Sequence, residues 1–118
     1  MSKSQDLGRW GEDIALEYLT SLGARLVQRN FLKRGGEIDL ILYHQDNLVF
    51  VEVRTRTSNQ FMDPIQSINS KKKNKIKRTA QHFYSYIWKE ESICRFDVVC
   101  ITGDASNYEL EHIEDAFT

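Results

Sequence analysis

The sequence has little cysteine and no long apolar run. Only two residues are cysteine, Cys94 and Cys100, and no CxxC pair or Cys/His cluster is present. Both cysteines fall in one expected strand, roughly 20 Å apart at about 3.3 Å per residue, which is beyond disulfide reach. The spacing predicts two reduced thiols and argues against a zinc site. Because no apolar run approaches a membrane span and the first residues lack an apolar signal core, we expect a soluble, cytoplasmic protein without membrane contact.

The chain has almost no net charge, but charges of one sign are concentrated in two segments. The 118 residues carry a net charge of −1, which argues against a uniformly basic nucleic-acid binder. The run KKKNKIKR at residues 71–78 nevertheless holds six cations and no anion, whereas the tail from Asp104 holds five acids and no Lys or Arg. Such asymmetry predicts a local anion-binding surface. With 41% hydrophobic residues, the chain is expected to form one domain, residues 1–118, around a single core.

Apolar residues recur at helical spacing in two segments and alternate in five others. The expected helices span residues 4–22, with Ser4 as N-cap, and a segment from about 65 or 70 to 89. The expected strands span residues 24–33, 36–44, 48–55, 94–102 and 108–114. The order α-β-β-β-α-β-β predicts an α/β (α+β) fold, with a mixed sheet flanked by helices.

The second and third strands, GEIDLILYH and LVFVEVRT, carry charged residues inside apolar runs. A two-residue turn at Asp46 and Asn47 would place Asp39, Glu52 and Arg54 on one face, with Arg54 opposite Asp39. A turn one residue earlier pairs Asp39 with Glu52 and keeps the cluster. A three-residue loop would put the two acids on opposite faces.

Two interpretations of this cluster remain open on spacing alone. Two converging carboxylates repel each other, and a hard divalent cation such as Mg²⁺ or Mn²⁺ would remove that repulsion. The alternative is a structural cross-strand ion pair between Asp39 and Arg54, with Glu52 at a wet edge.

The hairpin and several motifs around it resemble a known group of proteins. GEIDLI, a short turn and VFVEVRTR resemble the D-x(n)-E-x-K signature of the PD-(D/E)XK nuclease superfamily. The series GRWGED (8–13), GEIDLI, VFVEVRTR, the Lys-rich helix with Lys72 and RFDVV (95–99) resembles the YraN-type family, which is related to archaeal Holliday junction resolvases. The resemblance covers most of the chain and implies a restriction-endonuclease-like fold.

The resemblance also implies roles for individual residues. Asp39 and Glu52 would be the metal-binding acids, and Glu12 an additional acid near the metal. Arg54 stands where the superfamily has lysine; arginine stays charged and cannot act as a base, but it can hold a phosphate. The implied cofactor is Mg²⁺ or Mn²⁺, which would polarise the scissile phosphate and activate a water. The implied substrate is branched or structured DNA, and the implied assembly is a homodimer.

The remaining charged residues are candidates for nucleic-acid contacts. Lys71, Lys72 and Lys75 could hold phosphate, with a solvated helix face as the alternative. Arg56, together with Arg29, Lys33 and Arg34, could extend a basic rim. We expect Asp97 and Arg95 to form a structural pair and Tyr84 to lie in the core. The three histidines are expected to be surface or packing residues.

Three functions follow from these observations. The first is a metal-dependent endonuclease acting on branched or structured DNA. The second is a non-catalytic nucleic-acid-binding module on the same fold, with Arg54 as a phosphate clamp. The third is a protein–protein adaptor whose hairpin charges are structural. Whether the chain is an enzyme stays open here, because Arg54 replaces the usual lysine.

Overall fold

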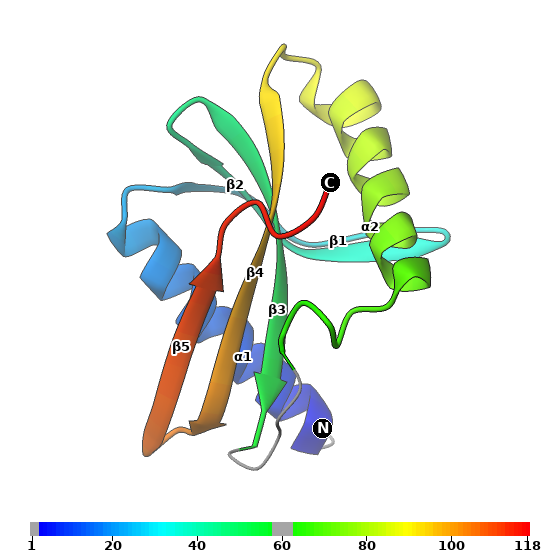
Figure 1. Cartoon of the computed structure of the whole chain (residues 1–118). Coiled ribbons are helices and arrows are strands. Elements are labelled where there is room, and N and C mark those ends of the chain that lie inside the picture. Colours follow the sequence, from blue (N-terminus) through cyan, green and yellow to red (C-terminus); the bar gives the residue numbers. More distant parts are fainter. Residues whose placement is uncertain (1–2, 58–62) are drawn as a thin grey trace.

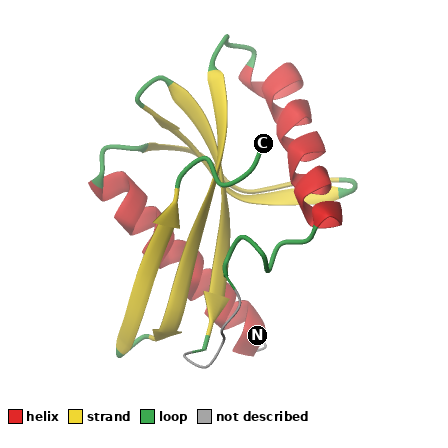
Figure 2. Ribbon diagram, in the orientation of Figure 1, coloured by secondary structure: helices red, strands yellow, loops and turns green. Residues whose placement is uncertain are grey.

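The computed structural model describes residues 3–57 and 63–118, with side chains from residue 7 onward, as a twisted mixed sheet with a helix on each face (Figures 1 and 2). The helical elements are α1 (Lys3–Ser21), α2 (Ser70–Phe83) and a π-helical turn, η1 (Tyr84–Trp88). The strands are β1 (Arg25–Lys33), β2 (Gly36–His44), β3 (Asn47–Arg56), β4 (Ile93–Asp104) and β5 (Asn107–Ile113). The predicted fold class and element order are confirmed.

The five strands lie side by side in their order along the chain. β3 is central and runs parallel to β4, while the other neighbouring pairs are antiparallel. The parallel pair is possible because α2 and η1 connect the two strands across one face of the sheet, as parallel strands require. The sheet is therefore mixed, as the sequence predicts.

Alternate residues of β3 enter different cores. Val49 and Val51 pack with Ala15 and Leu19 of α1, whereas Phe50 packs with α2. This two-sided burial explains why β3 is apolar on both faces. No helix of the described residues is long and apolar enough to cross a membrane.

Several expected boundaries are corrected. The first helix begins at Lys3, so Ser4 lies inside it and is not the N-cap. The second begins at Ser70, which confirms the later of its two expected starts, after the N-cap Asn69, but its α-helical part ends at Phe83. The π-helical turn then closes at Lys89, which adopts a left-handed conformation with φ 57°. The polar segment 56–64, whose composition predicts a loop, lies partly outside the described residues, and its first residue, Arg56, ends β3.

The β2–β3 turn is formed by Gln45 and Asp46, whose φ angles are 51° and 66°. Two successive left-handed residues are typical of the hairpin turn that matches strand twist. His44 therefore pairs with Asn47, and Leu40 with Val51. The turn at Asp46 and Asn47 is wrong by one residue, and the structure adopts the earlier of the two registers considered.

Candidate functional site

Asp39 and Glu52 meet where β2 and β3 separate. The last paired residues are Leu40 and Val51, and the same register places Asp39 opposite Glu52. Beyond this point the Val53 N–H donates to the Asp39 carboxylate Oδ2 at 2.8 Å. Asp39 is 9% exposed and Glu52 is 6% exposed. The predicted convergence of these two acids is confirmed, and we call them the acid pair.

Asp39 holds its proton unusually tightly. Burial is the largest cause, and the neighbouring charge of Glu52 adds to it. The charge of Glu12 and a hydrogen bond with Glu52 act in the same direction, against the Val53 N–H, which favours the ionised form. Together they raise the pKa of Asp39 to about 8. At neutral pH and without a metal, the acid pair therefore holds about one proton.

Two cations bind the other member of the acid pair. The Lys72 Nζ lies 2.8 Å from Glu52 Oε2, and the Arg54 Nη1 lies 3.5 Å from the same oxygen. Arg54 also donates to the Ser67 carbonyl at 3.4 Å. The expectation that Arg54 stands opposite Asp39 is wrong, because the register is shifted and the ion pair is with Glu52. Lys72, predicted as a phosphate contact on the Lys-rich helix, thus also lies beside the acid pair.

Close packing at two glycines brings both helices to this end of the sheet. A Cβ at Gly36, the first residue of β2, would overlap Thr79 of α2. A Cβ at Gly11 of α1 would overlap Thr55 of β3. The Asn69 side chain caps α2 by accepting from the Lys72 N–H at 2.8 Å. These contacts hold α1 against β3 and α2 against the start of β2, and from the first turn of α2 Lys72 reaches Glu52.

Glu12 lies within electrostatic reach of Asp39 but has its own partner. Arg29 Nε is 3.4 Å from Glu12 Oε1, and Arg29 Nη2 is 2.6 Å from Asp13 Oδ1. Arg29 is therefore paired with α1 and does not extend a free basic rim. Across residues 3–57 and 63–118, no three His, Cys, Asp or Glu side chains are grouped so as to hold a metal ion. Metal binding by Asp39, Glu52 and Glu12 stays a prediction.

The cations of α2 divide between two sides of the helix. Lys71, Lys72 and Lys75 line a cavity of about 340 Å³ beside the first residues of β2. Because Lys72 also contacts Glu52, this lysine cavity adjoins the acid pair. Arg56 instead donates to Thr102 Oγ1 at 3.0 Å, across the parallel strands.

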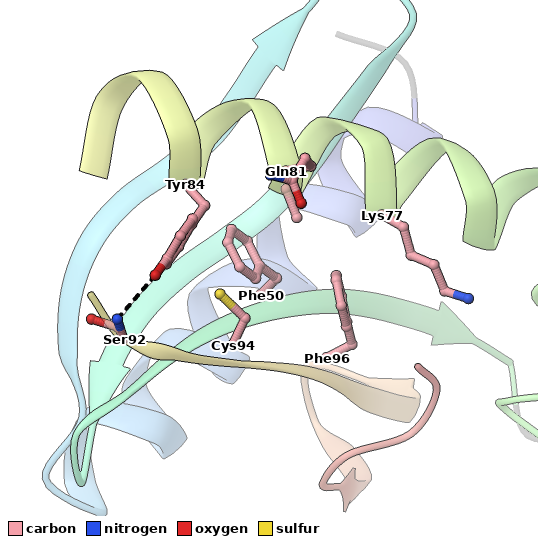
Figure 3. A pocket seen from close by; sticks show the side chains of 8 residues that line it. Phe50, Lys77, Gln81, Tyr84, Ser92, Cys94 and Phe96 are labelled. Atoms are coloured by element: carbon pink, nitrogen blue, oxygen red, sulfur yellow. Dashed lines mark hydrogen bonds between the residues drawn. The ribbon is translucent and has the colours of Figure 1, made fainter. Parts of the chain in front are cut away.

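The other side of α2 faces a second cavity that the sequence did not predict (Figure 3). Its volume is about 430 Å³. Phe50 and Phe96 lie on the strand side, while Tyr84 and Lys77 come from the helical side. Tyr84, expected to be core, is half-buried and lines this space.

A separate polar cluster fixes the C-terminal part of the sheet. Asp97 is fully buried and accepts from Arg95 Nε at 2.9 Å and from the Asp115 N–H at 3.0 Å. His112 Nε2 lies 2.9 Å from the same carboxylate, and its Nδ1 lies 3.3 Å from the Tyr18 hydroxyl. The predicted Arg95–Asp97 pair is confirmed, and His112 is a packing histidine held by it.

Both cysteines are free thiols, as predicted; Cys94 is exposed and Cys100 is buried.

The fold and the acid pair define a class of small α+β proteins. This chain combines a mixed five-stranded sheet, two flanking helices and a carboxylate pair between a strand end and a lysine-rich helix. The chain belongs to the family described as Uncharacterised protein family UPF0102, whose model matches residues 11–101. The predicted YraN-type membership is thereby confirmed.

Curated relatives match along nearly their whole length. A UPF0102 protein of Prosthecochloris aestuarii is 41% identical over 118 residues, which is 95% of this chain and 93% of the relative. One of Pelotomaculum thermopropionicum is 41% identical over 113 residues, or 94% of each chain. One of Stutzerimonas stutzeri is 40% identical over 119 residues, covering 99% of this chain and 98% of the relative.

Proposed function

We propose that the chain is a metal-dependent endonuclease acting on branched or structured DNA, with the acid pair as its catalytic centre. The observation that carries this proposal is the burial of Asp39 and Glu52 together at a strand end, beside the lysine cavity. Burying two carboxylates is costly unless a cation or proton compensates them. Such sites are often functional, because perturbed acids gather where chemistry is performed.

The donor set fits a hard divalent cation. Carboxylate oxygens suit Mg²⁺ and Mn²⁺, and a cation between Asp39 and Glu52 would replace the proton on Asp39. Glu12 is the third acid within electrostatic reach. The chemistry that such an ion supplies when bound is polarisation of a phosphate oxygen and a lower pKa for a bound water.

The side chains around the acid pair would position the DNA and stabilise charge. Lys72 and Arg54 place two positive charges next to Glu52, where negative charge develops on a phosphate during cleavage. Lys71 and Lys75 extend this positive surface along the lysine cavity to neighbouring phosphates. The guanidinium of Arg54 is planar and delocalised, whereas Lys72 presents a compact ammonium group. Lys72 therefore supplies from α2 the group that the strand position lacks.

We expect the wild-type chain to cut at least one branched DNA when Mg²⁺ or Mn²⁺ is present. The assay compares linear duplex, flap and four-way-junction DNA, with Asp39→Asn as the inactive variant. Asn retains the size of the side chain but removes the charge that a metal requires. Cleavage by Asp39→Asn at the wild-type rate would contradict the assignment and indicate a contaminating nuclease.

Lys72→Ala is expected to lower the cleavage rate about 100-fold, by roughly 2.7 kcal/mol of lost charge stabilisation. Lys71→Ala is the matched control, since Lys71 lines the same cavity but the ion pair with Glu52 is made by Lys72. It should weaken DNA binding without changing the single-turnover rate at saturating DNA. Equal single-turnover rates for both variants would assign Lys72 to binding alone.

One observation favours a second candidate, a non-catalytic nucleic-acid-binding module. Glu52 Oε2 is already paired with Lys72 and Arg54 in the metal-free protein, so the acid pair is partly compensated without a metal. In that case junction DNA would bind equally well in EDTA and in Mn²⁺, with the steep salt dependence of phosphate contacts and with no cleavage.

A further inference from the structure

The hairpin of β1 and β2 faces α1 just before it reaches the acid pair. Arg29 and Leu40 are paired partners on the two strands. The Arg29 Nε lies 3.4 Å from Glu12 Oε1 on α1, and Leu40 lies in the core that includes Ala15 of α1. Because alternate side chains of a strand share a face, the pair two residues farther along should face α1 as well.

That next pair faces α2 instead. Phe31 and Ile38, two residues farther along each strand, are paired and pack in the core formed with α2. The Phe31 ring contacts the Phe83 ring of α2, with centroids 5.1 Å apart. Residues 31–38, which we call the arm, are therefore turned over relative to the rest of the hairpin. In Figure 1 the arm extends beside α2 and away from β3.

The reversal of faces occurs at Asn30 and Asp39. Asn30 lies inside β1 with a left-handed backbone, at φ 54°. The register places it opposite Asp39, and within the described hairpin these two residues form no pair although the pairs on both sides of them do. A left-handed residue inside a strand interrupts the ladder and rotates the chain that follows, as a bulge does. Asn tolerates this conformation better than most residues other than Gly, so Asn30 accounts for the turned arm.

The turned arm leaves free the backbone group that holds Asp39. Because β2 leaves β3 after the pair of Leu40 and Val51, Val53 is paired with no described residue of β2. The Val53 N–H donates instead to the Asp39 carboxylate Oδ2, at 2.8 Å. This hydrogen bond directs the Asp39 carboxylate toward β3, where Glu52 lies.

The backbone of Asn30, and not its side chain, lies at the reversal. The side chain is exposed, so packing places little demand on its size or polarity. The demand falls on φ. Gly adopts the left-handed region freely, whereas a β-branched residue such as Val is a genuine outlier there. The conformational preference at this position can therefore be changed without altering any charge of the acid pair.

We propose that Asn30 is a positioning residue for the acid pair, whose left-handed backbone aims the Asp39 carboxylate at the point where it meets Glu52. The bearing of Asn30 on metal binding rests on the proposed function, whereas the geometry is present without a metal. Backbone outliers of this kind gather at functional sites, because the surrounding structure must hold them in place. Replacing a residue that orients a metal ligand typically lowers metal affinity about 10–100-fold. Asn30 acts on the site through Asp39 and not through its own amide.

The first measurement is the amide proton shift of Val53 by NMR in EDTA. Asp39→Ala removes the acceptor and so defines the shift of Val53 without its hydrogen bond. Asn30→Val should move the Val53 resonance most of the way to its position in Asp39→Ala, whereas Asn30→Gly should leave it at the wild-type position. Gln28→Val is the matched control, since Gln28 is an exposed and paired residue of the same strand. It should leave the Val53 resonance unchanged.

The second measurement is the affinity for Mn²⁺ by calorimetry. Asn30→Gly should bind as tightly as wild type, and Asn30→Val about tenfold more weakly. Asn30→Ala should fall between them, and it replaces Asn30→Val in both measurements if circular dichroism shows that the Val variant does not fold. This order follows the preference of each residue for the left-handed region, and it differs from the order of polarity or size.

Two results would overturn the proposal. If Asn30→Gly lost the Val53 shift or the Mn²⁺ affinity as fully as Asn30→Val, the amide side chain would be responsible and not the backbone. If Asn30→Val kept both, the left-handed residue would have no bearing on the acid pair. Wild-type protein that binds no Mn²⁺ would refute metal-dependent cleavage, and the Val53 measurement would then decide the role of Asn30 alone.

Discussion

Asp39→Asn is expected to stabilise the metal-free protein at pH 9 by on the order of 3–5 kcal/mol, and by almost nothing at pH 3. Most substitutions of buried residues destabilise, so the sign itself is diagnostic. Asn can still accept from the Val53 N–H and can donate to Glu52. It removes only the second negative charge that the folded chain must hold in the acid pair at high pH.

The pH range follows from the raised pKa of Asp39. Unfolded chains lose this proton near pH 4, whereas the native protein retains it up to about pH 8. The native state therefore binds the proton more tightly, and wild-type stability should fall as pH rises from about 4 through 8. In Asp39→Asn this contribution is absent, so the difference between the two proteins should grow across that interval.

Urea unfolding in EDTA at pH 4, 6 and 9 measures this difference. Asp46→Asn is the control, because Asp46 is an exposed acid in the turn of the same hairpin. It should leave the pH dependence of unfolding unchanged. Parallel stability curves for wild type and Asp39→Asn would mean that the acid pair is more hydrated than its burial implies.

Asp97→Asn is expected to destabilise the fold by about 3–5 kcal/mol at neutral pH, since it breaks a buried charge pair on one side only. Arg95 and His112 would remain largely buried beside a neutral amide. Small domains have a total stability of about 5–15 kcal/mol, so this loss is severe. Glu109→Gln on β5, an exposed acid, is the matched control and should change stability by less than about 0.5 kcal/mol.

The dependence of unfolding free energy on pH below neutrality tests the cluster of Asp97, Arg95 and His112. Burial alone would raise the pKa of Asp97, but hydrogen bonds from His112, Arg95 and the Asp115 N–H outweigh it and hold the pKa below its usual value. A depressed carboxyl pKa contributes stability above about pH 4 that is lost as pH falls. Asp97→Asn should therefore flatten the loss of stability in acid. An unchanged acid limb would indicate that another carboxylate controls it.

The local spacing of apolar residues predicted most of the fold, because each helix and strand buries one row of its own apolar side chains. Alternating apolar residues located the strands, and the run 48–53 is apolar on both faces, as is typical of a buried central strand. The sequence left three hairpin registers open, two with a two-residue turn and one with a three-residue loop, because Gln45, Asp46 and Asn47 are all acceptable turn residues. Only the paired strands decide which two of them become left-handed.

Non-local packing explains what the sequence did not predict. The ion pair between Lys72 and Glu52 depends on the position of α2 on the sheet. That position is fixed by the close contact of Gly36 with Thr79, two residues that are more than forty positions apart in the sequence. In the sequence, Phe50 and Phe96 have the pattern of ordinary core residues. They line a cavity because β5 stops pairing at Val98, and a strand's end is the least certain part of a pattern.

Calorimetric titration with Mn²⁺ at pH 8 tests the central claim, that Asp39 and Glu52 form a metal-binding acid pair. Wild type should bind one ion per chain and release about half a proton, because about half of the Asp39 carboxyls are still protonated at pH 8. Asp39→Asn and Glu52→Gln should each weaken binding at least tenfold, whereas Glu37→Gln, on the same strand, should bind as wild type does. Wild-type protein that binds no Mn²⁺, or variants that bind it unchanged, would contradict the account.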